Sequence, residues 1–498
     1  MKKLSAIILI MITGPALMAQ TAGQLDTTFS SNGYATYNWS MFASIGGLIE
    51  QPDTRILMNG KFDESSFIGR INNDSTPDLS FGINGIVIDS VPGYPVHSIN
   101  SMHLLPGGEI MTSAFSLDPV SMNGMCVYSR FHADGSRDTT FGTGGYVMNV
   151  MGQDTFNTNL ILPLPGGKSV IYESSISFAN TAVHTIMTGL NIDGSLDTSF
   201  GNGGQVISND LSGSDAIVTS GGKIIIYGLD GFFANNTVLA AFNSNGSPDL
   251  TFGINGISAS PLLQATSMGE IFSGNSGEMF TTLSYGFPAT QQISNFDSTG
   301  TKDPSFGFMG DLDMTGSQSL VTIETQDDGK ILCGGRMTGS GWLSRLLPDG
   351  SIDSTFGISG QVIFTTGTQF EYFSDLLNGS DGKIYAALNT QTPPTIFGNA
   401  VVRFTNDVAA GIFHTDIPDL TVYPNPASGE MFVSGWSYRT NSYAEVSISD
   451  LSGRNMYMSR SQATGDFRID TSNLAGGTYL LTVSTDDFRI VKKIVILR

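Results

Sequence analysis

Seven aspartates recur in one short pattern, Asp-x-x-Phe, and carboxylates repeated in tight turns are potential calcium ligands. The members of the pattern are Asp26 and Phe29, Asp78 and Phe81, Asp138 and Phe141, Asp197 and Phe200, Asp249 and Phe252, Asp303 and Phe306, and Asp353 and Phe356. The chain contains no complete Asp-x-Asn-x-Asp-Gly loop with a Glu at its twelfth position. An Asp side chain also stabilises a turn without metal, by accepting a backbone hydrogen bond from two residues on. We therefore predict structural turns and no cofactor, and calcium binding remains the alternative.

Other residues with catalytic chemistry are few, namely His97, His103, His132, His184, His414, Cys126 and Cys333. The histidines lack the His-Glu-x-x-His spacing of zinc enzymes, and no Gly-x-Ser-x-Gly, P-loop or Cys-x-x-Cys motif occurs. His97 and His103 fall in or near a strand that could line a channel, although a core or surface role is the simpler interpretation. The cysteines lie in different repeats and are expected to be buried thiols. We predict no catalytic, cofactor-binding or metal-binding residue.

The composition is typical of an exported all-β protein. Charged residues make up 13% of the 498 residues, and 60 glycines supply the conformations that tight turns need. Without residues 1–19 the net charge is −23, and all of it falls before Pro418. Such a chain is not expected to bind nucleic acid, which requires lysines and arginines. Solubility explains the acidity most simply, with basic partners or divalent cations as alternatives.

The spacing of the pattern predicts the architecture. Successive phenylalanines are 50 to 60 residues apart. Between them lie four short apolar segments and Gly-containing turns, such as residues 106–108, 221–223 and 328–330. Four short strands in each 50 residues are typical of one blade of a β-propeller. The following Phe is expected to pack between blades, where its truncation to Ala would cost about 3–5 kcal/mol.

The first and last copies predict how the ring closes. The seventh unit ends near residue 404 without an outer strand of its own, while an unused copy at Asp26–Phe29 precedes residues 33–37. We expect residues 33–37 to pair antiparallel with residues 400–404, because an unpaired edge would invite aggregation. The predicted fold is thus a seven-bladed β-propeller with an N-terminal strand closing the last blade, followed by a small Ig-like β-sandwich.

The repeated segments resemble the delta-60 repeat family, a β-propeller repeat of secreted bacterial proteins. The resemblance rests on residues 196–204, Leu-Asp-Thr-Ser-Phe-Gly-Asn-Gly-Gly, and on residues 352–360, and it covers about residues 25–405. The first copy departs from the pattern at Ser30, where a Gly is usual. The family implies a fold and provides no catalytic residues.

The end of the chain resembles the C-terminal sorting domain of the type IX secretion system of Bacteroidetes-group bacteria. The matching residues are Tyr423, Pro424, Asn425, Pro426, Gly477, Tyr479, Lys492 and Lys493, together with Leu451-Ser-Gly453. The resemblance implies transport across the outer membrane by the type IX machinery, removal of the domain by a sortase-like surface protease and frequent anchoring to lipopolysaccharide. An Ig-like stalk that stays attached is the alternative.

The start of the chain has the features of a secretory signal peptide. Lys2 and Lys3 precede an apolar run, and cleavage after Ala19 is expected. We predict a signal peptide at 1–19, a propeller at 20–405, a linker at 406–417 and a sorting domain at 418–498. The expected location is secreted or on the outer-membrane surface, with no transmembrane segment.

The function predicted from these features is that of a cell-surface binding or scaffold module, with a glycan or protein ligand at the propeller face. One alternative is a propeller enzyme, a glycan hydrolase or lyase, which paired carboxylates at the channel mouth would favour. The other is a structural protein that coats the surface. We expect no catalysis.

Overall fold

The computed structural model describes residues 22–37, 43–62, 65–91, 96–117, 124–150, 155–177, 182–231, 236–261, 265–286, 289–314, 318–392, 396–406, 421–434, 443–449, 455–462, 467–484 and 489–497. The predicted signal peptide and all of the predicted linker except Asn406 lie outside these residues. The chain divides into two compact units, Met1–Asp407 and Val408–Arg498. Every element found in the described residues is a β-strand.

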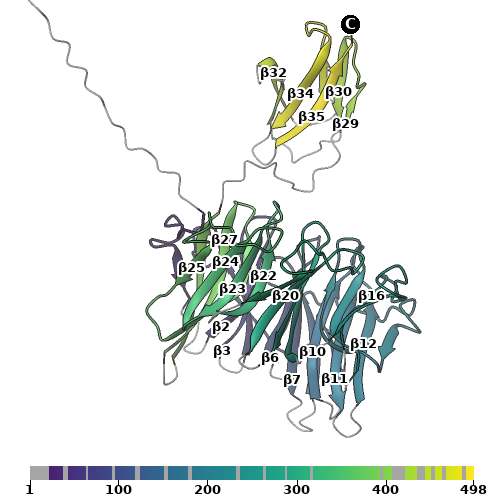
Figure 1. Cartoon of the computed structure of the whole chain (residues 1–498), viewed down its shortest axis with the longest axis vertical. Coiled ribbons are helices and arrows are strands. Elements are labelled where there is room, and N and C mark those ends of the chain that lie inside the picture. The colour runs from purple at the N-terminus through teal and green to yellow at the C-terminus, as the bar shows by residue number, and fades with distance from the viewer. Residues whose placement is uncertain are drawn as a thin grey trace, which may run out of the picture. The chain divides into compact units, whose positions relative to one another are not determined.

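The first unit contains seven four-stranded antiparallel sheets among its described residues (Figure 1). Blade 1 is β2 (Ala43–Glu50), β3 (Ile56–Phe62), β4 (Ser65–Ile71) and β5 (Ile86–Asp89); blade 2 is β6 (Val96–Leu104), β7 (Ile110–Leu117), β8 (Gly124–Phe131) and β9 (Tyr146–Val150); blade 3 is β10 (Thr155–Pro163), β11 (Ser169–Ser177), β12 (Ala182–Leu190) and β13 (Gln205–Ser208); blade 4 is β14 (Ser212–Val218), β15 (Ile224–Leu229), β16 (Asn236–Phe242) and β17 (Ile257–Pro261). Blade 5 is β18 (Ala265–Ser273), β19 (Met279–Tyr285), β20 (Thr290–Phe296) and β21 (Asp311–Met314); blade 6 is β22 (Gln318–Thr325), β23 (Ile331–Met337), β24 (Ser340–Leu346) and β25 (Gln361–Phe364); blade 7 is β26 (Phe370–Asn378), β27 (Lys383–Thr392), β28 (Ile396–Thr405) and β1 (Tyr34–Thr36).

The first strands of the blades form a closed ring. Each contacts the first strand of the next blade, in the order β2, β6, β10, β14, β18, β22 and β26, and β26 contacts β2 again. All seven strands carry a β-bulge where they pair with the second strand. Side chains near the bulges tie neighbouring blades together: the Thr158 hydroxyl donates to the Ser214 carbonyl at 2.6 Å, and the Ser214 hydroxyl donates to the Gly269 carbonyl at 3.0 Å. The inner edge of the ring is therefore held by side chains as well as by packing.

The N-terminal strand closes the ring as predicted. β1 pairs antiparallel with β28, with Tyr34 opposite Val402 and Thr36 opposite Ala400. Ahead of it, the amide of Asp26 donates to the carbonyl of Arg403 at 2.9 Å. The all-β propeller closed by its own N-terminal strand is confirmed, and the last blade is built from both ends of the unit.

The core lies between adjacent sheets. All seven phenylalanines of the repeated pattern are at most 1% exposed. Phe81, for example, packs in one cluster with Leu57 of its own blade and with Ile110 and Val127 of blade 2. Cys126 and Cys333 are buried free thiols, as expected. Burial raises the pKa of the Cys333 thiol to about 12, so neither reactivity nor a disulfide is indicated there.

The second unit contains a three-stranded and a four-stranded sheet, whose apolar faces share one core that includes Val446, Ile448 and Leu481. Its strands are β29 (Thr421–Tyr423), β30 (Glu430–Ser434), β31 (Tyr443–Ser449), β32 (Asn455–Gln462), β33 (Phe467–Asp470), β34 (Gly477–Ser484) and β35 (Arg489–Ile496), ordered β29-β30-β33 and β32-β31-β34-β35.

The sequence motif of this unit joins its opening segment to its last strand. The Asn425 amide donates to the Lys493 carbonyl at 3.0 Å, and its oxygen accepts from the Val495 amide at 2.9 Å. The Tyr423 ring stacks on Phe432, and the Tyr479 hydroxyl donates to the Ala475 carbonyl at 2.9 Å. The motif residues therefore shape the sandwich itself.

Candidate functional site

An arginine on the third strand pairs with the repeated Asp in four blades, an arrangement we call the Arg–Asp clasp. Its members are Arg70–Asp78, Arg130–Asp138, Arg345–Asp353 and Arg403–Asp26. In each clasp the guanidinium stacks 4.6–4.8 Å from the centroid of the repeated Phe. It also donates to the following blade, at Ala133, Ile192, Asn406 or Asn73. The clasp thus joins each of these blades to the next, combining a buried ion pair with a cation–π contact.

Two blades that lack the arginine use a lysine from the hairpin turn instead. In blade 3 Gly189 holds the arginine position, and Lys168 lies 2.7 Å from Asp197. In blade 4 Ala241 holds it, and Lys223 lies 2.6 Å from Asp249. The hydrogen bond from Lys223 lowers the pKa of Asp249 to about 2. In these two blades a lysine of the hairpin turn supplies the cation beside the repeated Asp, in place of an arginine of the third strand.

The other oxygen of each repeated Asp is used within its own turn. It accepts from the backbone amide two residues on and, at 2.5–2.7 Å, from the hydroxyl of that residue in all seven copies. These bonds support the interpretation of the aspartates as turn residues. Within the described part of the chain, no three or more His, Cys, Asp and Glu side chains are placed to hold a metal ion.

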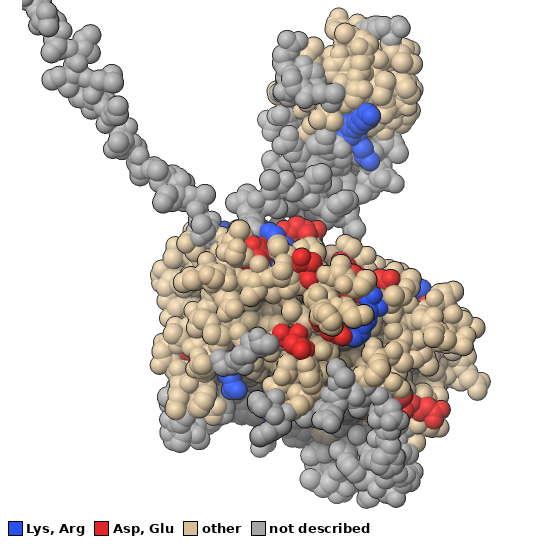
Figure 2. Space-filling view, viewed as in Figure 1, with Lys and Arg blue, Asp and Glu red and all other residues tan. Residues whose placement is uncertain are grey.

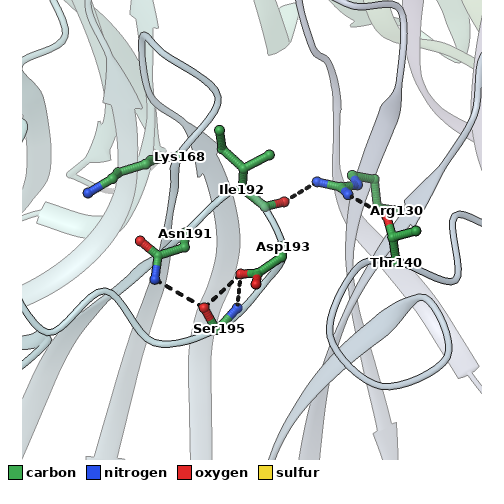
Figure 3. A pocket seen from close by; sticks show the side chains of 7 residues that line it. All are labelled: Arg130, Thr140, Lys168, Asn191, Ile192, Asp193 and Ser195. Carbon is green, nitrogen blue, oxygen red and sulfur yellow. Dashed lines mark hydrogen bonds between the residues drawn. The ribbon is translucent and has the colours of Figure 1, made fainter.

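A pocket of about 460 Å³ lies beside the clasp of blade 2 (Figure 3). It is lined by Arg130, Thr140, Lys168, Asn191, Ile192, Asp193 and Ser195. Figure 3 shows most of these groups bonded to one another: Arg130 donates to the Ile192 carbonyl, and the Ser195 hydroxyl donates to Asp193. Most polar atoms that line this pocket already form hydrogen bonds within and between blades 2 and 3. We therefore do not take it as the candidate site.

The inner edge of the ring has a different chemistry. The seven first strands contain no Lys or Arg, but they contain six carboxylates. Two of the six serve the scaffold: Glu50 accepts two bonds from Ser380, and Glu371 accepts bonds from Thr366 and Thr368. The remaining four, Asp215, Glu270, Glu324 and Asp375, come from four consecutive blades, and we call them the inner-edge carboxylates. Two of these also contact the next blade: Asp215 accepts from the amide of Ile271 at 2.9 Å, and Asp375 accepts from the amide of Leu48 at 2.7 Å.

Desolvation by the surrounding strands raises the pKa of all four inner-edge carboxylates, and repulsion from other carboxylates adds to the effect at Asp215, Glu324 and Asp375. The pKa of Asp215 is raised to about 7 by burial and then by the charge of Glu270. Burial, together with repulsion from Glu270, raises the pKa of Asp375 to about 7, although the amide of Leu48 donates to it. The pKa of Glu324 is raised to about 8 by burial and by Asp375. Asp215, Glu324 and Asp375 therefore exchange protons near neutral pH.

Water reaches this acidic group although it lies on the innermost strands. Glu270 is exposed, and the other three inner-edge carboxylates are partly exposed. Among the described residues, none of the four forms an ion pair with a Lys, Arg or His side chain. The outer surface is different: on the face visible in Figure 2, acidic and basic side chains form small separate groups among uncharged residues.

The histidine side chains that the structure describes form no metal-binding cluster with these carboxylates. His103 lies on β6, and burial lowers its pKa to about 4, which keeps it neutral. His97 also lies on β6, but its side chain is outside the described residues. His132 and His184 are on blades 2 and 3, and His184 faces Asn209 at 3.0 Å. His414 lies outside the described residues.

Neither the clasp arginines nor the inner-edge carboxylates were predicted from the sequence, although the sequence contains a signal for each. Arg70, Arg130 and Arg345 each stand eight residues before the repeated Asp, so the clasp was visible as a spacing. The inner-edge carboxylates could have been found by aligning the first strand of every unit and noting six acids and no bases.

Two family models match parts of the chain. Residues 421–497 match the secretion system C-terminal sorting domain, and residues 326–356 match the domain of unknown function (DUF5122) beta-propeller. Both components of the chain are thereby shown, a propeller and a type IX sorting domain. The sorting domain indicates export to the outer membrane or cell surface and interaction with the type IX machinery. No helix in the described residues is long and apolar enough to cross a membrane.

Several solved propeller structures resemble the first unit only distantly. A catalytically inactive virginiamycin B lyase from Staphylococcus aureus with quinupristin is 10% identical, with coverage of 74% of this chain and 98% of the lyase and a TM-score of 0.44. Prolyl oligopeptidase B from Galerina marginata is 9% identical, with coverage of 79% and 56% and a TM-score of 0.43. The β-propeller domain of the trilobed protease from Pyrococcus furiosus is 9% identical, with coverage of 79% and 96% and a TM-score of 0.33. No curated protein matches significantly. Likenesses this weak say nothing about activity.

Proposed function

We propose that this exported propeller is a surface binding module that takes an amine-bearing ligand at its inner edge. The observation that carries the proposal is the set of four carboxylates on four consecutive first strands, none of them paired with a cation among the described residues. Elsewhere in the same ring, buried aspartates have such a cation supplied by the chain. A ligand ammonium group would fill the corresponding role at the inner edge.

The raised pKa values give this binding a characteristic pH dependence. A carboxyl group with a pKa of about 7 is half protonated at that pH, and an ammonium group binds its ionised form. Binding of an ammonium group must therefore release protons from these carboxyl groups, and for a ligand whose amine stays protonated up to pH 8 the affinity must increase as the pH rises from 6 to 8. An ordinary surface carboxylate, ionised throughout this range, would show neither effect.

The test uses two oligosaccharides that differ in whether each amine carries an acetyl group. Calorimetry with the propeller should show binding of a glucosamine hexamer and weaker or no binding of its N-acetylated counterpart. Replacing Asp215 and Asp375 by Asn should weaken binding at least tenfold, whereas Asp210→Asn, on the exposed end of blade 3, should leave it unchanged. Equal binding of both sugars, or unchanged affinity in the Asp215 and Asp375 variant, would refute the proposal.

One observation favours an enzymatic alternative. A carboxyl group that stays protonated near neutral pH is suited to act as a general acid, and Glu324, with a pKa of about 8, lies electrostatically coupled to Asp375. A glycan hydrolase or lyase would release new chain ends from the hexamer. A product that appears with the wild-type protein and disappears in Glu324→Gln would establish catalysis, and an unchanged hexamer after saturating binding would exclude it for this substrate.

A further inference from the structure

Blade 5 differs from the other six because it lacks a cation at both positions that supply one. Asn295 of β20 holds the position of the clasp arginines, since its carbonyl accepts from the amide of Asp303 as that of Arg130 accepts from Asp138. Glu278 holds the position that Lys223 has in blade 4. Every other blade has a Lys or Arg at one or both positions. Blade 5 therefore presents its repeated Asp without the usual partner.

The joint around this gap is otherwise preserved. The amide of Gly307 donates to the carbonyl of Asp349 at 2.8 Å, as Gly142 donates to Asp193 at 2.7 Å in blade 2. The turn of blade 6 thus docks on blade 5 as the other turns do. Pro348 directly precedes Asp349, so it corresponds to Ile192, whose carbonyl accepts from Arg130. The acceptors that surround a guanidinium in the other joints are present here as well.

In the blade 5 joint one buried acceptor has no hydrogen-bond partner, and the repeated Asp has hydrogen bonds from Ser305 but no cation. Asn295 is 4% exposed, and its side-chain oxygen has no hydrogen-bond partner. Asp303 is partly exposed, whereas Asp138 and Asp353, which have arginines, are each 4% exposed. Within the part of the chain that the structure describes, no cation lies within 4 Å of Asp303. We call the place between Asn295, Asp303, Ser305 and Pro348, where four other joints hold a guanidinium, the blade 5 slot.

We propose that the blade 5 slot binds the guanidinium group of an arginine side chain supplied by another protein. The chain itself shows that this group fits, because a guanidinium occupies the equivalent place in blades 1, 2, 6 and 7. The incoming group donates to the Asp303 carboxylate, to the Pro348 carbonyl and to the Asn295 oxygen. Lys302 does not exclude it: Lys302 binds Asp311, and blade 2 accommodates both Arg130 and Arg137 at the equivalent positions.

The surroundings of the slot favour a protein as the source of the arginine. Phe308 and Met309, in the turn that follows Asp303, are 80% and 69% exposed. Blades 1, 4 and 6 expose a single Ile at the position of Phe308, followed by Asn or Ser, so the second exposed apolar side chain, Met309, distinguishes blade 5. Large apolar side chains exposed beside a charged slot are typical of a surface that another protein covers. A free arginine would leave these side chains in water, whereas an arginine within a peptide brings apolar neighbours to them.

The test compares three small probes on the intact propeller. Nα-acetyl-arginine amide should bind with a dissociation constant on the order of 1 mM. Its citrulline analogue, which has the same shape without the charge, should bind at least tenfold more weakly. An acetylated Leu-Arg-Leu amide should bind more tightly than the single arginine. Equal binding of the arginine and citrulline probes would refute guanidinium binding at the slot. Equal binding of the tripeptide and the single arginine would refute the proposal that another protein supplies the arginine.

A substitution that fills the slot from within gives the strongest control. Asn295→Arg should abolish arginine binding and raise Tm by about 2 °C, because it rebuilds the clasp found in four other blades. Asn295→Ala keeps the slot open but removes one of its acceptors, so it should weaken arginine binding less than Asp303→Asn, which should lose it. Retained binding in Asn295→Arg or in Asp303→Asn would contradict the proposal. Because these variants leave the inner-edge carboxylates intact, they do not affect the glucosamine-hexamer experiment.

Discussion

The Arg–Asp clasps and the inner-edge carboxylates use the same acidic groups in opposite ways. In a clasp, burial opposes ionisation of Asp138, but hydrogen bonds from Thr140 and the charge of Arg130 outweigh it and lower its pKa. At the inner edge, no such cation is present beside Asp375, and burial raises its pKa to about 7. Clasp residues recur from blade to blade, whereas the inner-edge carboxylates occur on only four blades. The residues that repeat from blade to blade stabilise the ring, whereas the residues proposed to bind ligands occur only on some blades.

The largest effect is expected from removing the strand that closes the ring. A chain starting at Asn38 loses β1, the buried Phe29 and the partner of Arg403. We expect Tm to fall by more than about 10 °C, since both the edge of blade 7 and a clasp are lost. The matched control starts at Gln20, as the mature protein is expected to. Equal Tm values for the two chains in calorimetry would contradict the closure.

Breaking one clasp should cost less than this but far more than breaking a surface ion pair. Arg130→Ala leaves Asp138 buried, and blade 2 has Glu109 rather than a lysine in its hairpin turn. We expect a loss of about 3–5 kcal/mol in the free energy of unfolding. Arg55→Ala, whose side chain is 39% exposed and whose partner Asp78 keeps Arg70, should cost less than about 1 kcal/mol. Urea unfolding of both variants measures the difference, and similar losses would show that the clasps are ordinary surface pairs.

Substitutions at the inner edge should have the smallest effect and the opposite sign. The folded pKa values of Asp215 and Asp375, about 7, lie above their ordinary value of 3.8, so their stabilising contribution is complete below pH 3.8 and is lost as the pH rises through 7. Replacing both by Asn should leave Tm nearly unchanged at about pH 3.5 and raise stability at pH 8, by on the order of 1 kcal/mol per group after allowance for their partial exposure. A variant less stable than the wild type at pH 8 would assign these groups to the scaffold.

The sequence predicted the scaffold better than the site, and the reason is physical. Repeated spacing fixed the blades, the buried phenylalanines and the closure by residues 33–37, because each blade needs the same four strands. The clasp involves three separate places in the chain, Arg130, Asp138 and Ile192, the last of which lies on the next blade. A pattern within one repeat therefore shows only part of it. The lysines of blades 3 and 4 replace the arginine from a different strand, which further hides the equivalence.

The inner-edge carboxylates were harder to predict for a different reason. Each first strand contains a β-bulge, and one inserted residue reverses which side chains face a given side of the sheet. Simple alternation along residues 212–218 or 370–378 therefore does not show where Asp215 or Asp375 points. The bulges are visible only once the strands are paired.

The opposite pKa shifts of the clasp and inner-edge carboxylates are tested most directly by titrating single carboxyl groups with carbon NMR in Asp-labelled protein. Assignment requires only the single variants Asp375→Asn and Asp138→Asn, each of which removes one signal. We expect the Asp375 signal to titrate near pH 7 and the Asp138 signal to titrate below 3.8, the ordinary pKa of an Asp side chain. If both signals titrate near or below pH 4, the carboxylates of the inner edge do not differ from those of the clasps, and the raised pKa values proposed for the inner edge are wrong.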